Sequence, residues 1–140
     1  MKAITLLILR STTGLLLIIW GARKLLNSGL GQRLSEKYYN GLLSVEALQI
    51  PLATAEVVLG MLIVLGAFRK ITYPLQAIVL GFGAAAIWKH LLDPLSLYLW
   101  EEGSKANLLF FPSTTVFAAA IVLLVFKEHD TLSLDEMFKR

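Results

Sequence analysis

Cysteine is absent from this chain of 140 residues. Without a thiol, the protein has no intramolecular disulfide relay, no thiolate nucleophile, and no cysteine ligands for an iron–sulfur cluster or a thiolate-bound haem. Small membrane proteins that oxidise thiols depend on such cysteines, so that class is excluded. The absence says nothing of the compartment, because there is no thiol to oxidise.

Charged residues are also scarce. They make up 16% of the chain, whereas hydrophobic residues make up 56%. A soluble domain of this length could not bury so much apolar surface. Backbone groups in lipid must be hydrogen-bonded within their own segment, so apolar segments of this kind are predicted to be helices. Four stretches approach the roughly 20 residues that cross the hydrocarbon of a bilayer: Ala3–Ala22, Ile50–Phe68, Tyr73–Leu92 and Asn107–Phe126.

We therefore expect an all-α fold, an integral membrane four-helix bundle of residues 1–126, followed by a charged cytoplasmic tail, residues 127–140. The long loops Asn27–Gln49 and Asp93–Ala106 suit short interfacial helices, whereas Arg69–Thr72 predicts a tight turn. Basic residues divide evenly between the two sides, so the positive-inside rule alone does not fix the orientation. The short basic turn favours both termini in the cytoplasm, with the bundle in a bacterial inner membrane.

Glu56 lies inside the second apolar stretch, where a carboxylate costs a few kcal/mol or more unless it is paired, neutralised or hydrated. A helix rises about 1.5 Å per residue. This rise places Lys24, Glu56, His90 and Asn107 in one layer near the side that carries the long loops. We expect this outer layer to be a ligand-binding site in which Lys24 and Glu56 form a pair or near-pair.

Arg10 lies about 10 Å from the opposite face, near the level of Gln76. A bare cation at that depth is costly. We therefore expect Arg10 to be a buried structural charge, bonded to Gln76, to hydroxyls of the fourth helix or to backbone carbonyls.

Small residues share helical faces with these polar groups. On the first helix the face holds Arg10, Gly14, Leu17, Gly21 and Lys24, at spacings of four and three. The other faces combine Glu56 with Gly60, Gln76 with Gly83 and His90, and Asn107 with Thr114. Small residues let membrane helices approach closely and polar residues bond across them, so these faces should point inward.

Each of these residues also has a purely structural interpretation. The glycines can serve helix packing alone, and Lys24 can be an anchor that reaches the headgroups. His90 can bond to a neighbouring carbonyl, and Asn107 can cap its helix. For Glu56 the structural alternative is a salt bridge, but the depth of the carboxylate favours a functional role.

Two runs of the sequence follow a known pattern. The first is Leu9-Arg10-Ser11-Thr12-Thr13-Gly14, continued by Gly21-Ala22-Arg23-Lys24-Leu25. The second is Ala55-Glu56-Val57-Val58-Leu59-Gly60, ending in Leu65-Gly66. They resemble the first two helices of the DoxX-like family. The resemblance carries over to Arg10, Gly14, Lys24 and Glu56, whereas His90 and Asn107 rest on the present sequence alone.

The resemblance implies a four-helix integral membrane protein more firmly than it implies an activity. Some members of the family are associated with oxidoreductase systems. One branch resembles the small subunit of a thiosulfate:quinone oxidoreductase, and animal relatives act as assembly chaperones for receptors.

Three functions stay open, and with them the question of enzyme activity. The first is a redox-associated accessory subunit that binds a quinone-like or other small amphipathic ligand near Glu56. A quinone is the candidate cofactor, bound without a covalent link, and a membrane or redox protein partner would supply electrons. The second is a non-catalytic assembly or stabilising subunit of a larger complex. The third is a transporter with Glu56 as its coupling carboxylate, which would require a homo-oligomer. Neither a metal site nor a nucleic-acid partner is expected.

Overall fold

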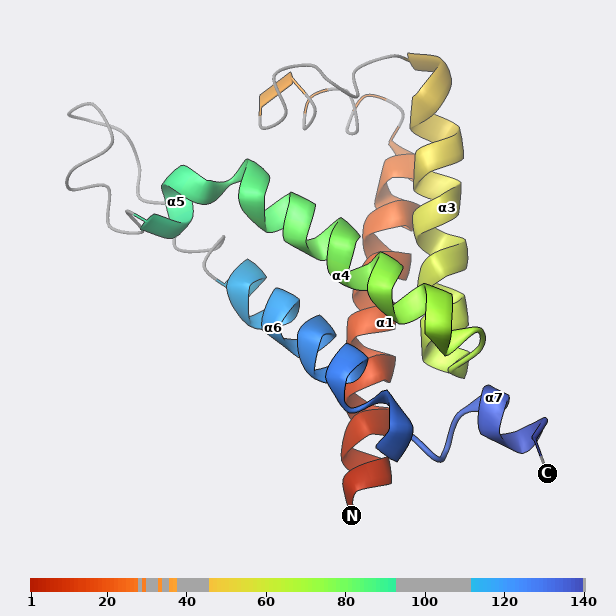
Figure 1. Cartoon of the computed structure of the whole chain (residues 1–140). Helices are drawn as coiled ribbons and strands as arrows, with labels where there is room; N and C mark the ends of the chain where they lie inside the picture. The colour runs from red at the N-terminus through yellow and green to blue at the C-terminus, as the bar shows by residue number, and fades with distance from the viewer. Residues whose placement is uncertain (28, 30–32, 34–35, 38–45, 93–111, 140) are drawn as a thin grey trace.

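A computed structural model describes residues 1–27, 29, 33, 36–37, 46–92 and 112–139. These residues form helices and contain no strand, which confirms the all-α prediction for the described part of the chain (Figure 1). The elements are α1 (Lys2–Leu26), α3 (Glu46–Leu65), α4 (Arg69–Ala86), α5 (Trp88–Leu92), α6 (Pro112–Val125), the 3₁₀ turn η2 (Lys127–His129) and α7 (Leu134–Met137).

Two helices of the described chain are long and apolar enough to cross a membrane. They are α1 and the Ala47–Leu65 part of α3, and α6 is a shorter apolar helix. The third predicted span is divided, because α4 ends at Ala86 and the short α5 follows it. The fourth predicted span is described only from Pro112 onward.

Glycines bring α1 and α3 into backbone contact. A Cβ atom added to Gly14 would lie 2.8 Å from the carbonyl oxygen of Gly60, and one added to Gly60 would lie 2.6 Å from that of Gly14. A Cβ atom on Gly21 would lie 2.7 Å from the carbonyl oxygen of Ala53. The glycine-bearing faces of these two helices therefore point at one another, as the spacing predicts.

The second pair of helices, α4 and α6, crosses α1, and both termini lie at one end of the molecule (Figure 1). We refer to this end as the inner end. Gly81 of α4 receives the ring of Phe117 of α6, which would lie 2.8 Å from an added Cβ atom. The buried core joins all four helices and consists of Leu6, Leu17, Leu59, Ile63, Tyr73 and Leu123.

The turn between α3 and α4 lies three residues earlier than predicted. Gly66 adopts a left-handed backbone with φ 67°, and its N–H donates to the carbonyl of Ile63 while the N–H of Ala67 donates to that of Leu62. These two bonds form a Schellman motif that ends α3. Arg69 therefore begins α4 rather than lying in the turn.

Candidate functional site

The Lys24–Glu56 pair lies between α1 and α3, toward the end opposite to the termini. Lys24 Nζ lies 2.5 Å from Glu56 Oε1, and each side chain is 21% exposed. The contact between Gly21 and Ala53, one helical turn before each partner, draws the two backbones together so that the side chains can meet. The predicted pairing of Lys24 with Glu56 is confirmed.

The second carboxylate oxygen distinguishes Glu56 from a residue in a closed salt bridge. Glu56 Oε2 is buried and has no hydrogen-bond partner within the described residues. An unsatisfied buried acceptor is costly and therefore uncommon. The pair thus leaves one charged acceptor without a donor among the described residues.

The side chains of the other two predicted members of the outer layer, His90 and Asn107, are not described by the structure. Asn107 lies outside the described residues, as does the side chain of His90. The backbone of His90 belongs to α5, which stands apart from the outer ends of α1 and α3 in Figure 1. Their share in a common site stays a prediction.

Arg10 is buried, at 3% exposed, and each nitrogen of its guanidinium donates a hydrogen bond at the inner end. Nη1 donates to both carboxylate oxygens of Asp130, at 2.8 and 2.9 Å. Nη2 donates to the carbonyl of Leu132 at 2.7 Å, and Nε donates to that of Val64 at 3.2 Å. The expected backbone carbonyls are thus among its partners, together with a carboxylate that the sequence reasoning missed.

Gln76 is buried as predicted, but it does not bind Arg10. Its exposed fraction is 0%, and neither its Nε2 nor its Oε1 has a hydrogen-bond partner within the described residues. The hypothesis of an Arg10–Gln76 bond is therefore wrong. Arg10 turns instead toward Asp130, because a carboxylate neutralises its charge whereas an amide does not.

Asp130 is the centre of a buried polar network. Its exposed fraction is 0%, and Oδ2 accepts a hydrogen bond of 2.5 Å from the hydroxyl of Tyr73. Arg69 Nη1 donates to the carbonyls of Asp130, at 2.7 Å, and of Lys127, at 2.8 Å. The same side chain forms an ion pair with Glu136. Two guanidinium groups thus hold the chain that follows α6 against the bundle.

This network was missed because its members are far apart in the sequence. Asp130 is separated from Arg10 by 120 positions, and it lies in a segment whose composition suggests a solvated tail. The sequence did contain one signal for this network, the charge of Arg10, since a buried arginine requires an anionic partner. Asp130 is an acid that closely follows the last apolar stretch.

Asp135 fixes α7 to the start of α4. Its Oδ1 and Oδ2 accept hydrogen bonds of 2.8 Å from the backbone N–H groups of Phe68 and Arg69. Burial alone would raise the pKa of Asp135, but these two bonds and the Arg69 guanidinium together hold that pKa below its usual value. The carboxylate form is therefore the one that docks α7.

Acidification should release α7. Because the pKa of Asp135 is lowered by folding, its contribution is present above the usual value of 3.8 and is lost as the pH falls through the lower folded value. The protection of the α7 amides against hydrogen exchange should therefore fall below about pH 4. In Asp135→Asn this exchange should already be fast at neutral pH. Slow exchange in the variant at neutral pH would show that Asp135 does not hold α7.

Within the described residues, no three histidine or acidic side chains are grouped so as to hold a metal ion. The inner network and the Lys24–Glu56 pair differ in how their carboxylates are hydrogen-bonded. In the inner network both oxygens of the buried Asp130 carboxylate accept hydrogen bonds, whereas Glu56 Oε2 has no hydrogen-bond partner within the described residues. The outer pair is therefore the better candidate for binding chemistry.

Fold and site together describe an all-helical protein with apolar helices of membrane-spanning length and a carboxylate–ammonium pair between the first two. The family model named DoxX matches residues 5–90, more than half of the chain. The chain belongs to the DoxX family. The match includes Arg10, Lys24, Glu56 and Arg69, but it ends before Asp130. No curated protein and no solved structure matches the chain.

Proposed function

We propose that this DoxX protein is a four-helix integral membrane subunit that binds the polar head of a quinone-like or other small amphipathic molecule at the Lys24–Glu56 pair. In this proposal it serves as an accessory subunit of a redox system. The observation that carries the proposal is the buried Oε2 of Glu56, which lies beside the Lys24 ammonium and has no hydrogen-bond partner in the described part of the chain.

The exposed faces of the helices support a membrane location. Ile4, Ile8, Leu15 and Ile19 are all exposed and lie on one face of α1, at spacings of four, seven and four. Hydrocarbon around the bundle would cover this face. Both termini lie at the inner end (Figure 1), which is consistent with an even number of crossings. Together with the adjacent basic residues Arg69 and Lys70, this supports four spans of a bacterial inner membrane with both termini in the cytoplasm.

The pair offers complementary groups to the two redox forms of a quinone. A quinone carbonyl would accept a hydrogen bond from the Lys24 ammonium, and a quinol hydroxyl would donate to Glu56 Oε2. The carboxylate is also a group to which a quinol can pass its proton. Electrons would travel to or from a partner protein, because the cysteine-free chain has no thiolate ligands for an iron–sulfur centre.

Gentle purification should test this proposal. Extracts of the wild-type protein should contain a quinone or similar amphiphile by mass spectrometry, and Glu56→Gln should reduce its amount at least about tenfold, as expected when ~1.4 kcal/mol of binding is lost. Thr54→Val is the matched control, since Thr54 is exposed on the same helix and its hydroxyl donates to the carbonyl of Ile50. The control should retain the ligand.

The single variant leaves Lys24 unpaired, so loss of ligand could reflect loss of fold. Glu56→Gln combined with Lys24→Met removes both charges and should restore stability without restoring the ligand. Ligand retained in the folded double variant would contradict the proposal. A co-purifying protein without any amphiphile would instead support the assembly function, and ion flux in liposomes would support a transporter.

A further inference from the structure

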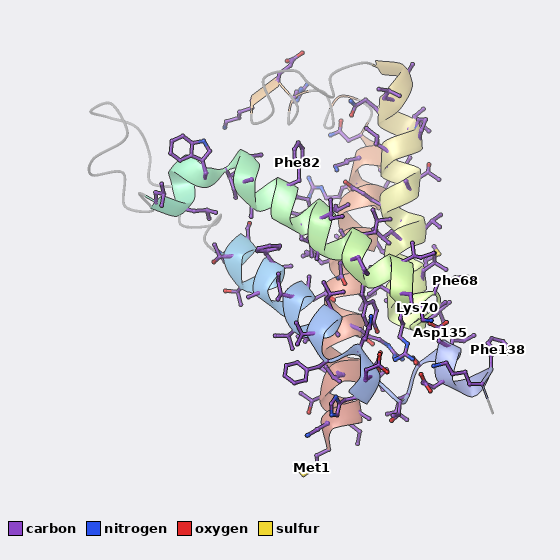
Figure 2. All side chains as sticks on the ribbon, viewed as in Figure 1. Met1, Phe68, Lys70, Phe82, Asp135 and Phe138 are labelled. Carbon is purple, nitrogen blue, oxygen red and sulfur yellow. The ribbon has the colours of Figure 1, made fainter. Side chains whose placement is uncertain are left out.

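Four large apolar side chains are exposed at the inner end, where α7 meets the start of α4. They are Phe68, Ile71, Met137 and Phe138, with exposed fractions between 66% and 82%. Figure 2 shows Phe68, Lys70, Asp135 and Phe138 together at this corner of the molecule. We refer to these four apolar residues with Lys70 and Lys139 as the inner apolar surface.

The inner apolar surface is held in place by the chain around it. Asp135 binds the N–H groups of Phe68 and Arg69, and its own N–H donates to the carbonyl of Gly66 at 3.3 Å. Phe68 has φ 51°, a left-handed backbone that is rare for a bulky residue. The Asp135 contact holds this strained residue while its side chain remains exposed.

The depth of this surface follows from Arg10. If the chain spans a membrane as proposed above, Arg10 and Lys24 mark two charged levels on α1. They are 14 positions apart, or about 21 Å along the helix, which is less than the ~30 Å of the hydrocarbon. Asp130 and the carbonyl of Leu132 are bound to Arg10. With Lys24 at the outer boundary, Arg10 would lie about 9 Å inside the inner boundary. The segment that runs from Leu132 into α7 would then lie close to that inner boundary.

The charges around the apolar side chains match an anionic surface. Lys70 is exposed, and Lys139 is 63% exposed although it pairs with Glu136 at 2.8 Å. The neighbouring acids are engaged within the protein, since Asp135 binds backbone amides and Glu136 also pairs with Arg69. Exposed phenylalanines flanked by lysines are typical of segments that lie in the interface of an anionic leaflet.

We infer that the inner apolar surface is a lipid-binding surface, in which Phe68, Ile71, Met137 and Phe138 enter the acyl boundary while Lys70 and Lys139 contact anionic headgroups. The inner network of Arg10, Arg69 and Asp130 positions this surface. The inference rests on the proposed membrane function.

The depth of the inner apolar surface can be measured with spin labels on single introduced cysteines, because the chain contains no cysteine. The full-length protein is reconstituted in phosphatidylcholine, alone or mixed with phosphatidylglycerol. A nitroxide at Phe138→Cys should collide with a water-soluble nickel chelate several-fold less often than one at Lys2→Cys, an exposed position at the inner end of α1, eight residues before Arg10. A third label at Ile19→Cys, on the exposed face of α1, reports whether the bundle itself is embedded.

The contact between the lysines and anionic headgroups is tested with spin-labelled lipids. The measured quantity is how strongly labelled phosphatidylglycerol associates with the protein relative to labelled phosphatidylcholine. Lys70→Gln combined with Lys139→Gln should lower the preference for phosphatidylglycerol over phosphatidylcholine by up to about fivefold for each lysine, or ~1 kcal/mol each near an anionic surface. Arginine at both positions should preserve the preference. An unchanged preference in the glutamine variant would overturn the headgroup contact.

The labels separate failure of this inference from failure of the membrane proposal. An Ile19 label that is shielded from water, together with a Phe138 label as accessible as that at Lys2, would overturn the lipid-binding surface alone. If the Ile19 label is also in water, the membrane proposal fails. A Phe138 label that is water-accessible in vesicles, while a photocrosslinker on the same cysteine captures a protein in cell membranes, would show that a protein, not lipid, covers this surface.

Discussion

Replacing Asp130 with alanine is expected to destabilise the protein by about 3–5 kcal/mol, the usual effect of removing one partner from a buried ion pair. The carboxylate is fully buried and neutralises Arg10, which is itself 3% exposed. Its loss also removes the acceptor of the Tyr73 hydroxyl. Unfolding in mixed micelles with increasing dodecyl sulfate, followed by tryptophan fluorescence, measures this effect.

A double variant tests whether the loss of stability comes from leaving one buried charge unpaired. Arg10→Leu combined with Asp130→Leu removes both charges, so it should be less destabilised than the sum of the two single changes. Glu128→Gln is the matched control, because Glu128 is an exposed acid two positions away and should change stability by less than about 0.5 kcal/mol. Simple additivity in the double variant would show that the two side chains do not form a pair in the membrane.

Gly60→Leu is expected to have the second large effect. It should lower the stability of the protein by about 3 kcal/mol, which is at the upper end of the usual cost of overpacking a core. Its first added carbon would lie 2.6 Å from the backbone oxygen of Gly14 and 2.7 Å from a side-chain carbon of Ile18. A backbone oxygen cannot move aside as a side chain can. The two helices would therefore have to separate, which would also draw Lys24 away from Glu56.

The control for this variant places a leucine side chain on another face of α3. Ala55 is exposed, so Ala55→Leu should leave stability nearly unchanged in lipid. The same micelle unfolding assay applies to both. If Gly60→Leu is as stable as Ala55→Leu, the close approach of α1 to α3 does not exist in the folded protein.

The first two helices and their polar pair could be predicted from the sequence because local rules determine them. Length and hydropathy identify the helices, and the 3.6-residue period places Gly14, Gly21 and Lys24 on one face. The rise per residue then brings Lys24 and Glu56 to one depth. The observed distance of 2.5 Å between Nζ and Oε1 agrees with that arithmetic.

The inner network could not be predicted in the same way. Arg10 has several polar groups at its depth, and period and rise do not decide among Gln76, hydroxyls and carbonyls. Its main partner, Asp130, comes from beyond the last long helix, so its position depends on the path of the chain rather than on helix geometry. The turn was also misplaced, because a left-handed Gly66 ended α3 before the basic residues.

The most direct test of the ligand proposal is a titration of the purified, delipidated protein with a short-chain benzoquinol, followed by infrared difference spectroscopy of the carboxylate bands. The account predicts saturable binding and a shift of one carboxylate band, assigned to Glu56 by its absence in Glu56→Gln. The shift should persist in Asp135→Asn, whose carboxylate belongs to the inner end. A correctly folded wild-type protein that binds no quinol, or binds it with an unchanged carboxylate spectrum, would contradict the proposal that Glu56 binds the ligand.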